Sequence, residues 1–186
     1  GDIKMGDTPS LVYLMNGDPD NPMGESWGGS FTPITHSSRT IFEGNSSKND
    51  TVTAYAELEW RFKGPDLPIP QDSICFTLEI SNQTWPGYYL GNGTYGVRYS
   101  SKKPETGSYV TKSTIPQLDA QSGQFVSTTP WPGKTTPTDY PLGSNWYSDK
   151  TSPDLFIGDQ QGAKTISKHR EAYLMDWAKR WQSINK

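Results

Sequence analysis

The chain has 186 residues, of which 32% are hydrophobic, and a formal net charge of -3. This length fits one domain of ordinary size, or a smaller domain with appendages, and excludes a second catalytic domain. The 17 basic and 20 acidic residues give no positive field of the kind that binds nucleic-acid phosphates, so nucleic acid is excluded as a partner. No apolar run approaches the ~18–20 residues of a membrane span, which predicts a globular protein.

The N-terminal sequence GDIKMGDTPS lacks the basic and apolar regions of a signal peptide. We therefore expect either that the mature chain begins there or that the sequence is part of a longer protein. The 18 glycines, 15 prolines and 12% aromatic residues favour strands and turns over helices.

Residues 1–40 are predicted to contain one short helix and a loop. Asp7 can cap a helix that includes the apolar residues 11–15, and Asn16-Gly17 ends it. The next segment, GDPDNPMGESWGGS, is too rich in Gly, Pro and Asp for regular structure.

Residues 45–130 show the period-two alternation of half-buried strands over 51–62 and 74–80. The inward set is Val52, Ala54, Ala56, Leu58, Trp60 and Phe62 in the first run, and Ile74, Phe76, Leu78 and Ile80 in the second. The single cysteine, Cys75, cannot form an internal disulfide and is interpreted as a buried thiol.

A hairpin is predicted next, because Gly91-Asn92-Gly93 can adopt the positive φ that a tight turn between 87–89 and 94–99 needs. Two more strands are expected at 107–113 and 122–128. Short strands at this spacing are typical of a mainly β fold, an immunoglobulin-like antiparallel β-sandwich.

Residues 131–160 contain prolines that exclude a central strand or a helix interior. Three large aromatic residues, Trp131, Trp146 and Tyr147, favour a packed arm over a solvated linker.

Residues 161–186 are predicted to form a long amphipathic helix. Its apolar stripe recurs at steps of three and four: Ala163, Ile166, Arg170, Tyr173, Leu174, Trp177, Trp181 and Ile184. A stripe with two tryptophans is expected to dock on the sandwich or on the N-terminal helix.

No common nucleotide, metalloprotease or serine-hydrolase motif occurs, so cofactor enzymes of the common types are disfavoured. His36 and His169 are interpreted as structural or surface residues. Asp18, Asp20 and Glu25 are either a solvated turn or a weak cation-binding loop, since the ordered ligands of an EF-hand are lacking.

The aromatic residues around the hairpin carry the candidate binding site. Sugars stack their apolar faces on Trp and Tyr rings, so Trp85, Tyr88, Tyr95 and Trp131 are the candidate glycan-binding residues. The alternative is that these side chains face the core.

The sequence from about 50 to 130 resembles the immunoglobulin-like module DUF5060. The matching residues are Gly87, Tyr88, Gly91, Gly93, Val97, Arg98, Tyr99, Pro104, Gly107, Tyr109, Thr111, Ser122, Gly123 and Phe125. The chain departs from the family pattern at Ser108, where a Trp is usual, and at Gly91-Asn92 in place of Asp-Gly. The resemblance implies a module that precedes the catalytic domain of bacterial glycoside hydrolases.

The flanks resemble a nucleoside hydrolase-like domain, DUF1593, found in proteins that include a cellulose-binding member. The similar segments are GDTPSLVYLMNGDPDNPMGESWGGSF and the closing HREAYLMDWAKRW. The resemblance implies that Asp7 is the last calcium ligand in a full-length parent, although Gly6 replaces the usual histidine. One aspartate cannot hold such an ion alone, so no cofactor is expected in this chain.

Three functions stay open. The first is a non-catalytic accessory module of bacterial polysaccharide breakdown that binds glycan weakly or supports an adjoining catalytic domain. The second is the C-terminal portion of a calcium-dependent nucleoside hydrolase-like or glycoside hydrolase, and the third is a structural spacer or protein-docking module. The resemblance implies a periplasmic, cell-surface or secreted bacterial protein.

Overall fold

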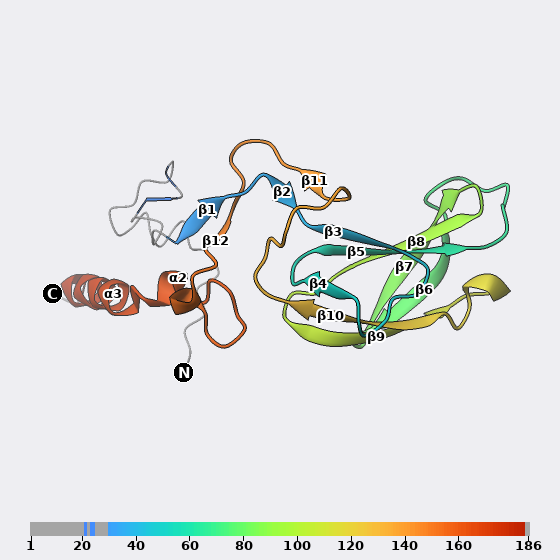
Figure 1. The fold of residues 1–186 in the computed structure, drawn as a ribbon. Helices are drawn as coiled ribbons and strands as arrows, with labels where there is room; N and C mark the ends of the chain where they lie inside the picture. The colour runs from blue at the N-terminus through green and yellow to red at the C-terminus, as the bar shows by residue number, and fades with distance from the viewer. Residues whose placement is uncertain (1–20, 22, 25–29, 185–186) are drawn as a thin grey trace. The chain divides into compact units, whose positions relative to one another are not determined.

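A computed structural model describes residues 21, 23–24 and 30–184 of the chain (Figure 1). The chain forms two compact units, one of residues 35–143 and the other of residues 1–34 with 144–186. The predicted helix after Asp7 and the acidic residues Asp18, Asp20 and Glu25 lie outside the described residues.

The unit of residues 35–143, the sheet unit, contains an eight-stranded sheet in the order β3-β5-β8-β7-β6-β9-β10-β4. The strands are β3 (Arg39–Glu43), β4 (Thr51–Thr53), β5 (Glu57–Lys63), β6 (Ile74–Ile80), β7 (Gln83–Gly91), β8 (Thr94–Ser100), β9 (Glu105–Lys112) and β10 (Ser122–Thr128). A 3-10 turn, η2 (Pro116–Leu118), precedes β10. All neighbours are antiparallel except the two edge pairs, β3 with β5 and β10 with β4. The predicted mainly β, antiparallel-rich fold is confirmed.

The sheet curls into two layers, with β3, β5 and β8 in one and β4, β9 and β10 in the other (Figure 1). The core lies between them around Trp60, whose ring centroid is 4.7 Å from that of Tyr109 and 5.8 Å from that of Phe125. The Trp60 indole N–H donates a 2.8 Å hydrogen bond to Ser46 Oγ, so the ring is buried without leaving its polar atom unpaired.

The alternation over 51–62 correctly predicts which side chains are buried, but it predicts one strand where the structure has two. Every inward residue named there is buried, yet the run breaks into β4 and β5 at Tyr55, which has a φ of 66°. The break is needed because β4 and β5 lie at different places in the sheet. β4 is an edge strand, whereas β5 lies between β3 and β8 near the opposite edge.

The start of β6 also differs from the prediction. A bulge between Ile74 and Phe76 shifts the register, so Ile74 is 66% exposed while Phe76, Leu78 and Ile80 are buried. The same shift leaves Cys75 half-buried rather than buried.

The predicted hairpin is confirmed. β7 and β8 pair antiparallel, and Gly91, Asn92 and Gly93 have φ values of 95°, 51° and 63° in the turn. A Cβ at Gly93 would lie 2.7 Å from the Gly64 carbonyl oxygen, so this position requires glycine both for its φ and for space.

The sheet unit is wider than residues 45–130 because two segments outside that range join it. Short strands β2 (His36–Ser37) and β11 (Tyr140–Pro141) pair antiparallel, which brings the Pro-rich residues 131–143 into the unit. The predicted arm 131–160 is thus divided between the two units.

In the other unit, β1 (Phe31–Pro33) pairs antiparallel with β12 (Tyr147–Asp149). η3 (Pro153–Leu155), α2 (Lys164–Ser167) and α3 (Arg170–Ile184) follow. The predicted single helix is therefore two helices. Its stripe is not packed as expected: Tyr173 is buried, but Trp177, Trp181 and Ile184 are 62%, 58% and 76% exposed.

Candidate functional site

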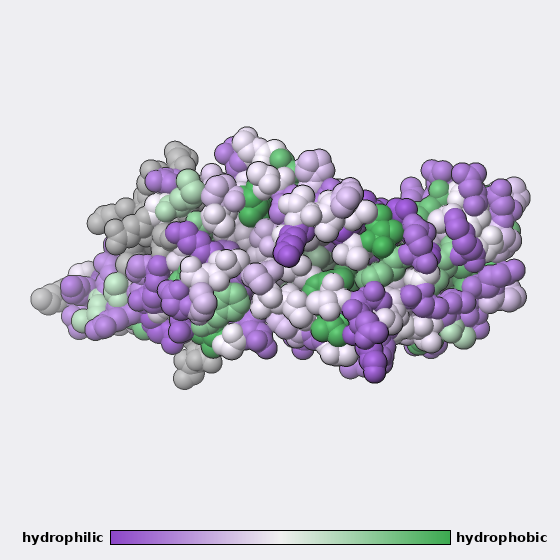
Figure 2. Space-filling model, in the orientation of Figure 1, coloured by the Kyte–Doolittle hydropathy of each residue, from purple (hydrophilic) through white to green (hydrophobic). Residues whose placement is uncertain are grey.

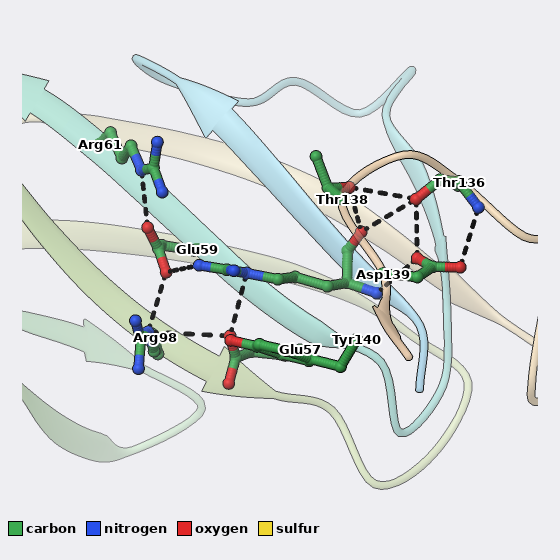
Figure 3. A network of polar contacts seen from close by, with 9 residues as sticks. Glu57, Glu59, Arg61, Arg98, Thr136, Thr138, Asp139 and Tyr140 are labelled. Atoms are coloured by element: carbon green, nitrogen blue, oxygen red, sulfur yellow. Dashed lines mark hydrogen bonds and ion pairs between the residues drawn. The ribbon is translucent and has the colours of Figure 1, made fainter. Parts of the chain in front are cut away.

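Glu59 is the centre of a charged network on the outer side of β5. Trp60 and Leu58 point into the core, so the pleat turns the Glu59 side chain to the opposite face, where it is nevertheless only 1% exposed. Three guanidinium groups cover it, with Arg39 Nη2 at 2.5 Å, Arg61 Nε at 2.6 Å and Arg98 Nε at 2.8 Å (Figure 3).

These contacts decide the ionisation of Glu59. Burial by itself raises the pKa of the carboxyl, but the hydrogen bonds from Arg61, Arg98 and Arg39 outweigh it and lower the pKa to about 2. A carboxylate held ionised in this way is a poor proton donor or acceptor near neutral pH. The network therefore suits a structural role better than general acid–base catalysis.

The same network holds residues 133–141 at the edge of the sheet (Figure 3). These residues are part of the predicted arm 131–160 and are called the arm from here on. Asp139 accepts hydrogen bonds from the Arg39 amide at 2.9 Å and from the Thr136 amide and hydroxyl at 2.8 and 2.7 Å. The Tyr140 hydroxyl donates to Glu57 at 2.7 Å, and the Arg39 guanidinium lies 4.8 Å from the centre of the Tyr140 ring.

His36 belongs to this attachment as well. Its Nε2 atom lies 3.2 Å from the Gly133 carbonyl oxygen and 3.7 Å from Asp139 Oδ2. Burial raises the pKa of Asp139, but the hydrogen bonds from Arg39 and Thr136 outweigh it and lower the pKa below its ordinary value.

A polar groove of about 610 Å³, the β6–β9 groove, runs beside the β6–β7 turn. Its lining residues are Glu79, Ile80, Ser81, Asn82, Gln83, Thr84, Ser108, Tyr109 and Val110. The turn that shapes it has positive φ at Ser81 (49°) and Asn82 (59°). One lining carboxylate, Glu79, pairs with Lys112 at 2.6 Å.

Trp85 is connected to this groove through Gln83. The Trp85 indole N–H donates a 3.2 Å hydrogen bond to Gln83 Oε1. The ring meets Tyr99 edge-on, at 5.5 Å and 85° between planes, and is half-buried because it also packs against the core. Hydroxyl, amide and carboxylate groups beside an indole are the groups that bind the hydroxyls and apolar faces of a sugar.

The other candidate residues lie elsewhere. Tyr95 is fully buried and its hydroxyl donates to the Pro65 carbonyl oxygen at 2.7 Å, so it is a core residue with no ring face open to a ligand. Tyr88 is half-buried and opposite Gly96 in the β7–β8 pair, on the outer side of the sheet. Trp131 contacts Tyr55, and Asp7 lies outside the described residues.

The sequence did not indicate that Glu59 is buried, that Tyr55 interrupts a strand, or that the polar residues of the groove lie together. Glu59 occupies an outward position of a strand, where a solvated side chain is the usual expectation, and only the three arginines bury it. The groove depends on bringing β6, β7 and β9 together, which no local pattern records.

Within residues 21, 23–24 and 30–184, no group of three or more His, Cys, Asp or Glu side chains is placed to hold a metal ion. The described part of the chain also has no helix whose length and apolarity would suit a membrane span.

Comparison with known proteins gives a family match for one segment of the chain. Residues 51–114 match DUF5060, a domain of unknown function. All residues that line the β6–β9 groove, and Glu59 with Arg61 and Arg98, lie within this DUF5060 segment. The match does not extend to the flanks, so their resemblance to DUF1593 stays a prediction.

No curated protein matches the chain. Among solved structures, a candidate glycoside hydrolase from Bacteroides vulgatus is 23% identical with a TM-score of 0.37, over 42% of this chain and 16% of that protein. Auracyanin B is 11% identical with a TM-score of 0.32, over 55% of this chain and 96% of that protein. TM-scores this low do not establish a shared fold.

Proposed function

We propose that the chain is a non-catalytic β module that binds glycan weakly and assists polysaccharide breakdown by an exported bacterial protein. The observation that supports this proposal is the β6–β9 groove with Trp85 beside it. Its polar side chains come from a turn and from the three strands β6, β7 and β9, which the sheet holds in place.

The chemistry of the groove suits a neutral sugar. Ser81, Thr84 and Ser108 offer hydroxyls, and Asn82 and Gln83 offer both donors and acceptors. A glycan chain can pass along a groove that is open to solvent, whereas an enclosed pocket would admit only a chain end. An open site also buries little of its ligand, so weak binding is expected.

The test is a titration of the ¹⁵N-labelled chain with cellohexaose and xylohexaose, followed by NMR. We expect shifts at the amides of 79–84 and 108–110. Trp85→Ala should weaken binding roughly three- to tenfold, since an aromatic contact contributes ~0.5–1.5 kcal/mol. Trp146→Ala, which removes an exposed tryptophan of the other unit, is the control.

Equal affinity in the parent and in Trp85→Ala removes Trp85 from the site. Shifts that map to other parts of the sheet unit contradict the assignment to the β6–β9 groove. No binding to either oligosaccharide contradicts the proposal as a whole.

A second candidate function is support of an adjoining catalytic domain. It is favoured by α3, where the Trp177 and Trp181 rings stack at 6.0 Å and 20° and both are exposed. An exposed pair of tryptophans is typical of a docking surface. In this setting the chain is the C-terminal portion of a calcium-dependent hydrolase, with Asp7 as one ligand.

The DNA upstream of the codon for Gly1 tests this second function. An in-frame, aspartate-rich DxDxxxDD segment within a domain's length supports it. Tight stoichiometric calcium binding by the 186-residue chain alone contradicts the part in which Asp7 depends on ligands from elsewhere.

A further inference from the structure

Tyr55 has an unusual backbone for a large side chain. It lies between β4 and β5 with a φ of 66°, in the left-handed region that glycine and asparagine adopt much more readily. Its neighbours Ala54 and Ala56 are 0% and 1% exposed, whereas Tyr55 itself is 52% exposed. The turn therefore holds the half-exposed Tyr55 ring at the surface, between two buried alanines.

The backbone of this turn is fixed without help from the Tyr55 ring. The Ala54 amide donates to the Thr128 carbonyl at 2.7 Å, the Tyr55 amide to the Ser101 carbonyl at 2.6 Å, and the Ala56 amide to the Thr53 carbonyl at 3.0 Å. A glycine or asparagine would make the same three bonds with less strain. The large side chain at this position is thus explained by something other than the turn, and such outliers gather at functional sites.

A second aromatic ring stands beside it. The Trp131 ring, from the segment after β10, lies 6.3 Å from the Tyr55 ring with 66° between the planes. Both residues belong to the sheet unit. Two rings inclined in this way form a corner: one ring can stack on a flat ligand while the other contacts its edge.

We propose that Tyr55 and Trp131 form a second glycan subsite, separate from the β6–β9 groove. The exposed Tyr55 ring stacks on the apolar face of a pyranose, and Trp131 lies against the edge of the same sugar. Sugars with all-equatorial hydroxyls, such as β-1,4-linked glucose, present the flat C–H face that this arrangement takes. The inference rests on the proposed glycan binding and adds a site to it.

The strain at Tyr55 makes the proposal testable by two readouts. Tyr55→Asn removes the ring and relieves the backbone, so we expect a higher Tm together with severalfold weaker binding of cellohexaose. Trp131→Ala should also weaken binding. Tyr55→Phe keeps the ring and the strain, so its affinity and Tm should stay close to those of the parent.

The experiment is an NMR titration of each variant with cellohexaose and a thermal melt of the same samples. Shifts near residues 53–56 and 131–133 in the parent, lost in Tyr55→Asn, support the subsite. Unchanged affinity in Tyr55→Asn overturns it, and a lower Tm in the same variant then assigns the ring to packing against Trp131.

The groove variants keep the two proposals apart. If Trp85→Ala abolishes all binding and Tyr55→Asn abolishes none, glycan binding stands and the second subsite is wrong. If the parent binds no oligosaccharide, both are wrong.

Discussion

Arg39 donates a 2.5 Å hydrogen bond from its guanidinium to Glu59, across the parallel edge pair of β3 and β5. The backbone amide of the same arginine donates to Asp139 in the arm. One residue therefore joins the buried carboxylate of the sheet to the Pro-rich segment that covers its edge.

Glu59→Ala should destabilise the sheet unit strongly. It leaves the partly buried guanidinium groups of Arg39 and Arg61 with only their longer ion pairs, to Glu57 at 3.3 Å and to Glu43 at 3.4 Å. Removing one partner of a buried pair costs ~3–5 kcal/mol. Because Arg98 is 58% exposed and can return to water, we expect the lower end of this range in urea unfolding. Glu79→Ala, which breaks an exposed pair with Lys112, is the control and should cost less than ~1 kcal/mol. A similar loss in both variants would show that burial of Glu59 contributes nothing.

Stability should fall in acid through Glu59. Its pKa is about 2 in the folded chain against an ordinary 4.5, so the folded state holds the proton more weakly than the unfolded state. A carboxyl with a lowered pKa stabilises the fold above its ordinary pKa and loses that contribution as pH falls from about 4.5 to about 2. Urea unfolding of the parent and Glu59→Gln over this window measures it. We expect a steeper decline in the parent, and parallel curves would contradict the assignment.

Gly107→Ala should destabilise the core without changing any charge. A Cβ at this position would lie 2.2 Å from Phe125 Cε1 and 2.3 Å from its Cζ, and Phe125 is fully buried. Overpacking of this kind costs ~1–3 kcal/mol. Gly143→Ala has nothing within 4 Å of the added atom and should stay within ~0.5 kcal/mol of the parent. A stable Gly107→Ala would mean that the Phe125 ring moves aside at no cost.

Asp139→Ala should release the arm while the sheet stays folded. The variant removes hydrogen bonds to the Arg39 amide and to Thr136 from a carboxylate that is 3% exposed. Charge-assisted bonds contribute ~1.5–3 kcal/mol, so tryptic cleavage after the exposed Lys134 should be about tenfold faster or more. Asp154→Ala, at an exposed acidic residue of the other unit, should leave the rate unchanged. Equal rates in the two variants would contradict the role of Asp139.

Local patterns predicted the parts of this protein that depend on neighbouring residues. Alternation placed Leu58, Trp60 and Phe62 in the core, because a strand turns every second side chain to the same face. Gly91-Asn92-Gly93 predicted the β7–β8 turn, because few residues tolerate positive φ. The ends of these elements were not predicted. The interruption at Tyr55 keeps the apolar pattern and changes only the backbone, whereas the bulge before Phe76 turns Ile74 out of the core.

The sequence by itself thus determined the mainly β class, the central hairpin and the core-facing residues of the strands except at the start of β6, since each depends on the pattern of residues close along the chain. Only the tertiary structure decided that Glu59 is buried under three arginines, that Tyr95 belongs to the core, and that Tyr55 meets Trp131. Those facts depend on which distant strands become neighbours. The burial of one side chain is then set by groups as far away as residue 98 or 131, which no local spacing encodes.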